Sequence, residues 1–175
     1  PASPGWRLEA GKQGVMLHGV RSRIVRRQRP LILVSACLAG EKCRYDGRDN
    51  AVEAIVTLKE RGLCLPVCPE VLGELPTPRI PSERQGARVV AKDGTDVSHA
   101  FKLGARRALY IAMKHGLRLA ILKSRSPSCG FGSIYDGTFS HRLISGNGIF
   151  AEMLQREGFS IWTEENCSPL LANMP

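Results

Sequence analysis

Three short apolar segments, each about as long as a buried β-strand, lead directly into a cysteine. Residues 31–36 precede Cys37, residues 63–67 precede Cys68, and the run LAILK precedes the glycine-flanked SPSCG that contains Cys129. Stretches with helical periodicity separate these segments, and alternation of strands and helices is typical of parallel sheets with right-handed crossovers. The sequence therefore predicts an α/β fold, a single compact domain with a mostly parallel, Rossmann-like sheet flanked by helices.

The same pattern predicts the individual elements. We expect strands at 31–36, 63–67, 118–123 and 159–163, helices at 51–61, 98–115 and 148–157, and a short edge strand at 88–91. The longest helix has one apolar face, made of Phe101, Ala105, Ala108, Leu109, Ala112 and Met113. The proline-rich stretch 69–87 is expected to be an ordered loop rather than a helix or a central strand.

The net charge of +9 is unevenly distributed over the 175 residues. Residues 1–30 carry +6 of it, in a segment with few core-forming side chains. We expect this basic N-terminal extension to be disordered or partly vector-derived, or else an arm that binds phosphate. The domain proper is expected at 31–175. The sequence has neither a secretory signal nor an apolar run of membrane-spanning length, so a reduced, cytoplasmic protein is expected.

The three strand-end cysteines are the main candidates for chemistry. The carboxyl ends of parallel strands lie along one edge of a sheet, so Cys37, Cys68 and Cys129 are expected to meet in space. Three convergent thiolates suit an iron–sulfur cluster with one iron left open. For any one of them alone, a buried apolar cysteine is the competing interpretation. Cys43 is a weaker candidate, as a fourth ligand or a persulfide carrier.

Polar residues in the same loops are the other candidates. Glu70 is a candidate acid or base, and Ser128 is also a candidate catalytic group; both lie next to proposed ligands. The alternatives are a cap for Glu70 and a backbone-bonded turn hydroxyl for Ser128. The expected substrate-binding residues are Tyr45, Arg79, Lys123 and Ser126. For the two cations among these, a surface ion pair is the competing interpretation.

Five motifs, SACLAGEKCRYDG, CPEVLGELPTPRIPSE, KDGTDVSHAFKLGA, KSRSPSCG and GNGIFAEMLQREGF, together resemble the thiouracil desulfurase family over about residues 31–166. The resemblance implies a [4Fe–4S] cluster held by Cys37, Cys68 and Cys129. It further implies removal of sulfur from a thiolated pyrimidine, without redox change, by an open iron that binds the substrate sulfur, to give uracil or uridine and hydrogen sulfide. Glu70 and Ser128 match the family's proposed acid/base and orienting groups.

One departure from the family pattern concerns substrate choice. Family members often have Gly-Gly where this chain has Gly73-Glu74, and we expect the added carboxylate to alter which substrate fits and to disfavour phosphorylated ones. The substrate remains open between base, nucleoside, nucleotide and tRNA, and the oligomeric state between monomer and dimer. The competing functions are an iron–sulfur sensor or sulfur carrier without turnover, a thiolated-RNA-binding module that uses the basic arm, and a zinc protein.

Overall fold

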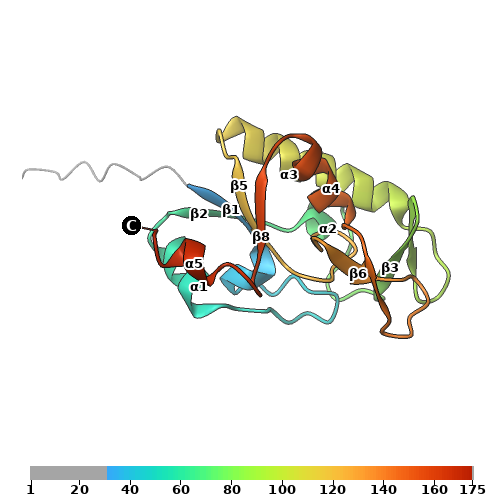
Figure 1. Ribbon diagram of the computed structural model, residues 1–175. Coiled ribbons are helices and arrows are strands. Elements are labelled where there is room, and N and C mark those ends of the chain that lie inside the picture. Colours follow the sequence, from blue (N-terminus) through green and yellow to red (C-terminus); the bar gives the residue numbers. More distant parts are fainter. Residues whose placement is uncertain (1–30, 175) are drawn as a thin grey trace, which may run out of the picture.

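A four-stranded parallel sheet forms the centre of the protein in the computed structural model, which describes residues 31–174 (Figure 1). Its strands are β1 (Ile32–Ser35), β2 (Cys64–Val67), β5 (Leu119–Leu122) and β8 (Ser160–Thr163), in the order β2-β1-β5-β8. All three strand pairs are parallel, so the predicted α/β fold is confirmed. The basic extension 1–30 lies outside the described residues.

Helices cover both faces of this sheet (Figure 1). One face packs against α3 (Ser98–Lys114) and α4 (Ile149–Arg156), whose Phe101 and Phe150 are almost completely buried. The other face packs against α1 (Glu53–Glu60) and α5 (Ser168–Leu171). Met113, which was expected on the buried face of α3, is 38% exposed because it lies in the last turn of the helix, at the edge of the layer.

The proline-rich stretch differs from the expected loop. It begins with a one-turn helix, α2 (Pro69–Leu72), and ends with strand β3 (Ser82–Gln85), which pairs antiparallel with β4 (Arg88–Ala91). The prediction of no helix was wrong because a proline in the first turn of a helix has a fitting φ and needs no N–H partner. The edge strand at 88–91 is confirmed.

The sequence analysis also did not predict α5, a 3₁₀ turn and a second hairpin. Cys37 lies in a 3₁₀ turn, η1 (Ala36–Ala39), that follows β1 directly. After Cys129 the chain forms a small hairpin of β6 (Ser133–Tyr135) and β7 (Leu143–Ser145), which are only three residues long. No helix within residues 31–174 combines the length and the apolar character needed to cross a bilayer.

Candidate functional site

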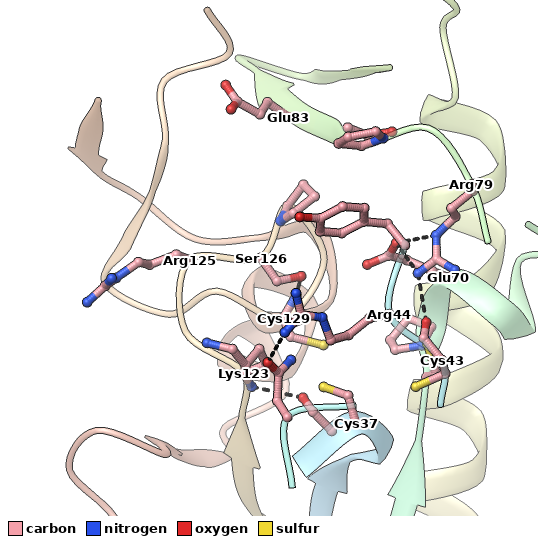
Figure 2. Close-up of a pocket in the computed structure, with 18 of the residues that line it drawn as sticks. Cys37, Cys43, Arg44, Glu70, Arg79, Glu83, Lys123, Arg125, Ser126 and Cys129 are labelled. Carbon is pink, nitrogen blue, oxygen red and sulfur yellow. Dashed lines mark hydrogen bonds and ion pairs between the residues drawn. The ribbon is translucent and has the colours of Figure 1, made fainter. Parts of the chain in front are cut away.

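The three predicted cysteines lie at the carboxyl ends of three adjacent strands. Cys37 follows β1, Cys68 follows β2 as the residue before α2, and Cys129 is in the loop after β5. All three line one cavity of about 510 Å³, shown in Figure 2, and Cys43 lines it too. All four are free thiols. The convergence expected for cysteines at the carboxyl ends of parallel strands is therefore present.

The environment of these thiols separates them into two kinds. A hydrogen bond with the Cys43 side chain lowers the pKa of Cys37 to about 7, although burial acts in the opposite direction. The same Cys43 side chain lowers the pKa of Cys68, whereas its contacts with both neighbours raise the pKa of Cys43 itself. Burial raises the pKa of Cys129. Cys43 is thus the thiol with the raised pKa beside two thiols whose pKa values are lowered, and thiolates are the form that binds metal.

Thiolates are the ligands of iron–sulfur clusters, so this donor set fits such a cluster. Nowhere in residues 31–174 do three His, Cys, Asp or Glu side chains lie close enough to share one metal ion. A tetrahedral zinc site needs its ligands about 2.0 to 2.3 Å from one centre. A [4Fe–4S] cluster takes each thiolate on a separate iron, so its ligands stand farther apart. The cavity between the cysteines has room for such a group.

Glu70 lies on the cavity wall in the first turn of α2, held by Arg79. The Arg79 guanidinium donates to Oε2 of Glu70, with Nε at 2.8 Å and Nη2 at 2.6 Å (Figure 2). Arg79 also donates to the carbonyl oxygens of Cys43 and Pro76 and to Oγ1 of Thr77. These contacts use the whole fork of the guanidinium, so Arg79 positions Glu70 and has no donor left for an anionic substrate.

Lys123 and Ser126 also lie on the cavity wall, where they hold protein groups. The ammonium of Lys123 donates to Glu164 and to both oxygens of Ser124. Oγ of Ser126 accepts the backbone N–H groups of residues 128 and 129, at 3.1 and 3.0 Å, and so fixes the turn that presents Cys129. Tyr45 is 43% exposed on the same wall, with Arg44 over its ring.

Ser128 has a different position from the other candidates. It is fully buried, it is not among the residues that line the cavity, and its Oγ has no hydrogen-bond partner among the described residues. An orphaned hydroxyl in this position costs stability unless a further group completes its bonding. It directly precedes Cys129, so a group held by that thiol lies only one residue away.

The expectation for Glu74 is not supported by its position. Glu74 does not line the cavity, and its carboxylate pairs with Arg107 of α3 at 2.7 Å, with 71% of the side chain exposed. The backbone of Glu74 is left-handed, with a φ of +68°. Glycine adopts this conformation at lower cost than glutamate, which explains why a second glycine is common at this position in the family. The departure from Gly-Gly therefore changes a turn on the surface rather than the wall of the site.

Several wall residues escaped the sequence reasoning. They include Asn50, Lys92, Ser124, Arg125, Tyr135, Phe139 and His141, of which Lys92, Ser124 and Arg125 lie within the quoted motifs. Three of these, Tyr135, Phe139 and His141, belong to the β6–β7 hairpin, and Glu83 of β3 lies beside them on the wall. The hairpin strands are too short to show an alternation of apolar and polar residues, so no sequence signal indicated that this segment returns to the site.

Comparison with known proteins identifies the site. Residues 32–166 match the family described as 2-thiouracil desulfurase, which covers the whole sheet and all the cysteines of the cavity. The chain belongs to this family. A solved structure described as the [4Fe-4S]-dependent thiouracil desulfidase TudS is 43% identical, covers 82% of this chain and 95% of its own, and superposes with a TM-score of 0.77. The Bacillus subtilis (strain 168) protein YbbK, described as uncharacterized, is 38% identical over 151 residues, 81% of this chain and all of its own.

Membership in the 2-thiouracil desulfurase family confirms the resemblance drawn from the five motifs. Membership also shows that the protein is an enzyme, because the family is named for the reaction that it catalyses. The similar solved structure is that of an iron–sulfur-dependent enzyme, in agreement with a cavity lined by four thiols.

Proposed function

We propose that the protein is a [4Fe–4S]-dependent desulfurase that removes sulfur from a thiolated pyrimidine, as base, nucleoside or nucleotide, and releases hydrogen sulfide. Family membership and the iron–sulfur dependence of TudS support the proposal. The single observation that carries it for this chain is the meeting of Cys37, Cys68 and Cys129 around one cavity at the strand ends.

Cys37, Cys68 and Cys129 are the residues that would hold the cluster. Each follows a different strand, so the rigid sheet fixes the spacing of the thiols. When bound, the cluster supplies a Lewis-acidic iron with affinity for the soft thiocarbonyl sulfur. Cys43 stands beside two of these ligands and is the group that holds a proton between them. We assign it a place next to the cluster rather than a place among the three ligands.

Glu70 is the proposed acid/base. Its Oε2 is bound by Arg79, whereas no hydrogen bond to Oε1 is formed within residues 31–174. A carboxylate held at one oxygen has a fixed direction and keeps the other oxygen for proton transfer. Replacement of the ring sulfur consumes one water, whose oxygen bonds to the carbon and whose two protons leave with the sulfur as hydrogen sulfide, and Glu70 is the wall residue suited to move such a proton. Arg79 keeps it in place.

Sulfide release by the reconstituted protein tests the proposal. Purified protein loaded with iron and sulfide under anaerobic conditions is mixed with 2-thiouracil, 4-thiouracil and their nucleotides, and hydrogen sulfide and the oxygenated product are measured. We expect turnover that is lost in Cys129→Ala together with the visible absorption of the cluster. Glu70→Gln should retain the cluster and lose turnover, which separates the acid/base role from cluster binding.

The outcome also separates the enzyme from a sensor or sulfur carrier. A protein with that role would bind iron and sulfide and give no product from any thiolated pyrimidine. Desulfuration that persists when Cys37, Cys68 and Cys129 are all replaced by alanine would exclude the proposed cluster chemistry.

A further inference from the structure

Glu83 is a buried carboxylate in the wall of the cavity that the proposed reaction does not use. It lies in β3 and is 8% exposed, and no cationic side chain among residues 31–174 pairs with it. Its Oε2 instead accepts two backbone N–H groups, those of Gly137 and Phe139, each at 3.0 Å. Burying a carboxylate is costly unless hydrogen bonds compensate it, so these two bonds are the reason for its position.

The segment that Glu83 holds, residues 136–142, connects β6 with β7 and is here called the strap. Three of its residues have left-handed backbone conformations: Gly137 at φ +88°, Phe139 at +59° and His141 at +62°. For Phe139 and His141 this conformation is intrinsically unfavourable. A chain adopts it only where its surroundings impose it, which is often at a functional site.

Contacts with β3 impose the shape of the strap. Besides the two bonds from Glu83, Nε2 of Gln85 donates to the carbonyl oxygen of Gly137 at 2.6 Å. A methyl carbon on Gly137 would lie 2.9 Å from the carbonyl oxygen of Arg84 and 2.4 Å from the Gln85 side chain, so only glycine allows this approach. Glu83 thus connects the β3–β4 hairpin with the β6–β7 hairpin.

The strap and the strand before it bring three aromatic rings to the cavity. Tyr135, Phe139 and His141 all line it, and the rings of Tyr135 and His141 meet edge to face at 6.1 Å. Phe139 is half-buried and follows the backbone that Glu83 fixes. Figure 2 shows Glu83 at the opposite end of the cavity from Cys37. A planar heterocycle has a π-face that such side chains bind by stacking, whatever its ring substituents.

We infer that the strap is a substrate-binding element of the site: Glu83 positions it, and Phe139 provides the surface on which the planar thiolated heterocycle stacks. This inference rests on the proposed function for the identity of the heterocycle. Glu83 is a positioning residue, since it acts through the two amide groups of the strap. The iron–sulfur ligands come from other segments and are independent of it.

Three variants test the inference: Phe139→Ala, Glu83→Ala and Glu83→Gln. Loss of one base–aromatic stack weakens binding by about 5-fold to 150-fold. We therefore expect Phe139→Ala and Glu83→Ala to raise KM for 2-thiouracil about tenfold, with little change in kcat. Glu83→Gln should recover most of the affinity, because its side-chain carbonyl can accept the same two N–H groups. Glu60→Ala, which removes an exposed carboxylate of α1, is the matched control and should leave KM unchanged.

Two measurements do not depend on turnover. Hydrogen exchange at the amides of Gly137 and Phe139 should accelerate in Glu83→Ala and stay slow in Glu83→Gln. The Kd of 2-thiouracil, measured by calorimetry, should follow KM. Iron and sulfide content should equal that of the wild type in every variant, and loss of the cluster in Glu83→Ala would mean a purely structural role and overturn the inference.

The inference and the proposed function can fail separately. If the wild type releases sulfide but KM and Kd are unchanged in Phe139→Ala and Glu83→Ala, the strap has no role in recognition and the inference is refuted. If the wild type binds 2-thiouracil without releasing sulfide, the proposed function fails, and the Kd values of the variants alone decide the inference. If the wild type neither binds nor desulfurates any thiolated pyrimidine, both are refuted.

Discussion

Helices α2 and α3 pack so closely that adding a single methyl group between them would displace α2 and with it part of the site. Helix α2 begins directly after Cys68 and carries Glu70. It lies so close to α3 that a methyl carbon on Gly104 would be 1.8 Å from the carbonyl oxygen of Pro69 and 2.6 Å from the backbone nitrogen of Gly73. The approach is reciprocal, because a methyl carbon on Gly73 would lie 2.1 Å from the carbonyl oxygen of Ala100.

Gly104→Ala therefore has to push the two helices apart. The 1.8 Å approach falls about 1.6 Å short of the 3.4 Å at which ordinary contact begins, and the opposing atom is backbone. Overpacking of this kind costs typically about 1 to 3 kcal/mol, and the better helix propensity of alanine returns about 1 kcal/mol. A shift of about 1 Å at a catalytic group lowers the rate by as much as about 100-fold. Activity should therefore fall far more than stability.

Urea denaturation, iron and sulfide counts and initial rates of sulfide release measure the three parts of this prediction. Gly104→Ala should lower the free energy of unfolding by no more than about 2 kcal/mol, bind less cluster through the displaced Cys68, and lose most of its turnover. Arg106→Ala, at an exposed position of the same helix, is the control and should behave as the wild type. A Gly104→Ala protein with wild-type stability, cluster content and rate would refute the idea that this contact sets the position of α2.

Three further predictions concern single side chains. Arg79→Ala leaves the carboxylate of Glu70, which is only 17% exposed, without its partner, so the free energy of unfolding should fall by up to roughly 3 kcal/mol. The rate of sulfide release should fall while the cluster content is retained, and an unchanged rate of sulfide release would refute the positioning role. Glu74→Gly relieves a left-handed glutamate at a cost of one exposed ion pair, so the urea midpoint should rise slightly and the ratio of rates for 2-thiouracil and its nucleotide should not change. In cluster-free protein the pKa of Cys37 is lowered to about 7 from 9.0, so its thiolate forms as the pH rises through 7. Iodoacetamide should therefore label Cys37 with a midpoint near pH 7, while buried Cys129 stays unlabelled. A labelling rate for Cys37 that still rises at pH 9 would contradict this prediction.

Much of the fold was predictable because the strands of the sheet are short apolar segments that differ clearly in sequence from the more polar segments around them. Each of the four strands was found within two residues of its position, and their parallel direction, though not their order in the sheet, follows from the helices between them. The one-turn helix α2 and the β6–β7 hairpin were missed. Both are too short for a periodic pattern, and they are held by tertiary contacts rather than by their own propensities.

The site was predictable where its residues stand next to strand ends. Nine of the ten candidates, Cys43 included, line the cavity, and Ser128 alone does not. The functions of the two cations were harder to predict, because a sequence shows that a charge is present but not which partner takes it. Arg79 and Lys123 both turned out to be bound by neighbouring protein groups, a result that depends on loops far apart in the chain.

Sequence alone determined the α/β class, the family and three of the four thiols of the cavity, because strand–helix alternation and motifs are local properties that survive without coordinates. Only the tertiary structure decided which groups contact one another at the site. These contacts are the ion pair of Arg79 with Glu70, the hydrogen bonds of Glu83 with the strap, and the close approach of α3 to α2 at Gly104. The physical reason is that hydrogen bonds and steric contacts form between atoms a few ångströms apart in space, whereas the segments that carry these atoms are separated along the chain by up to 56 residues.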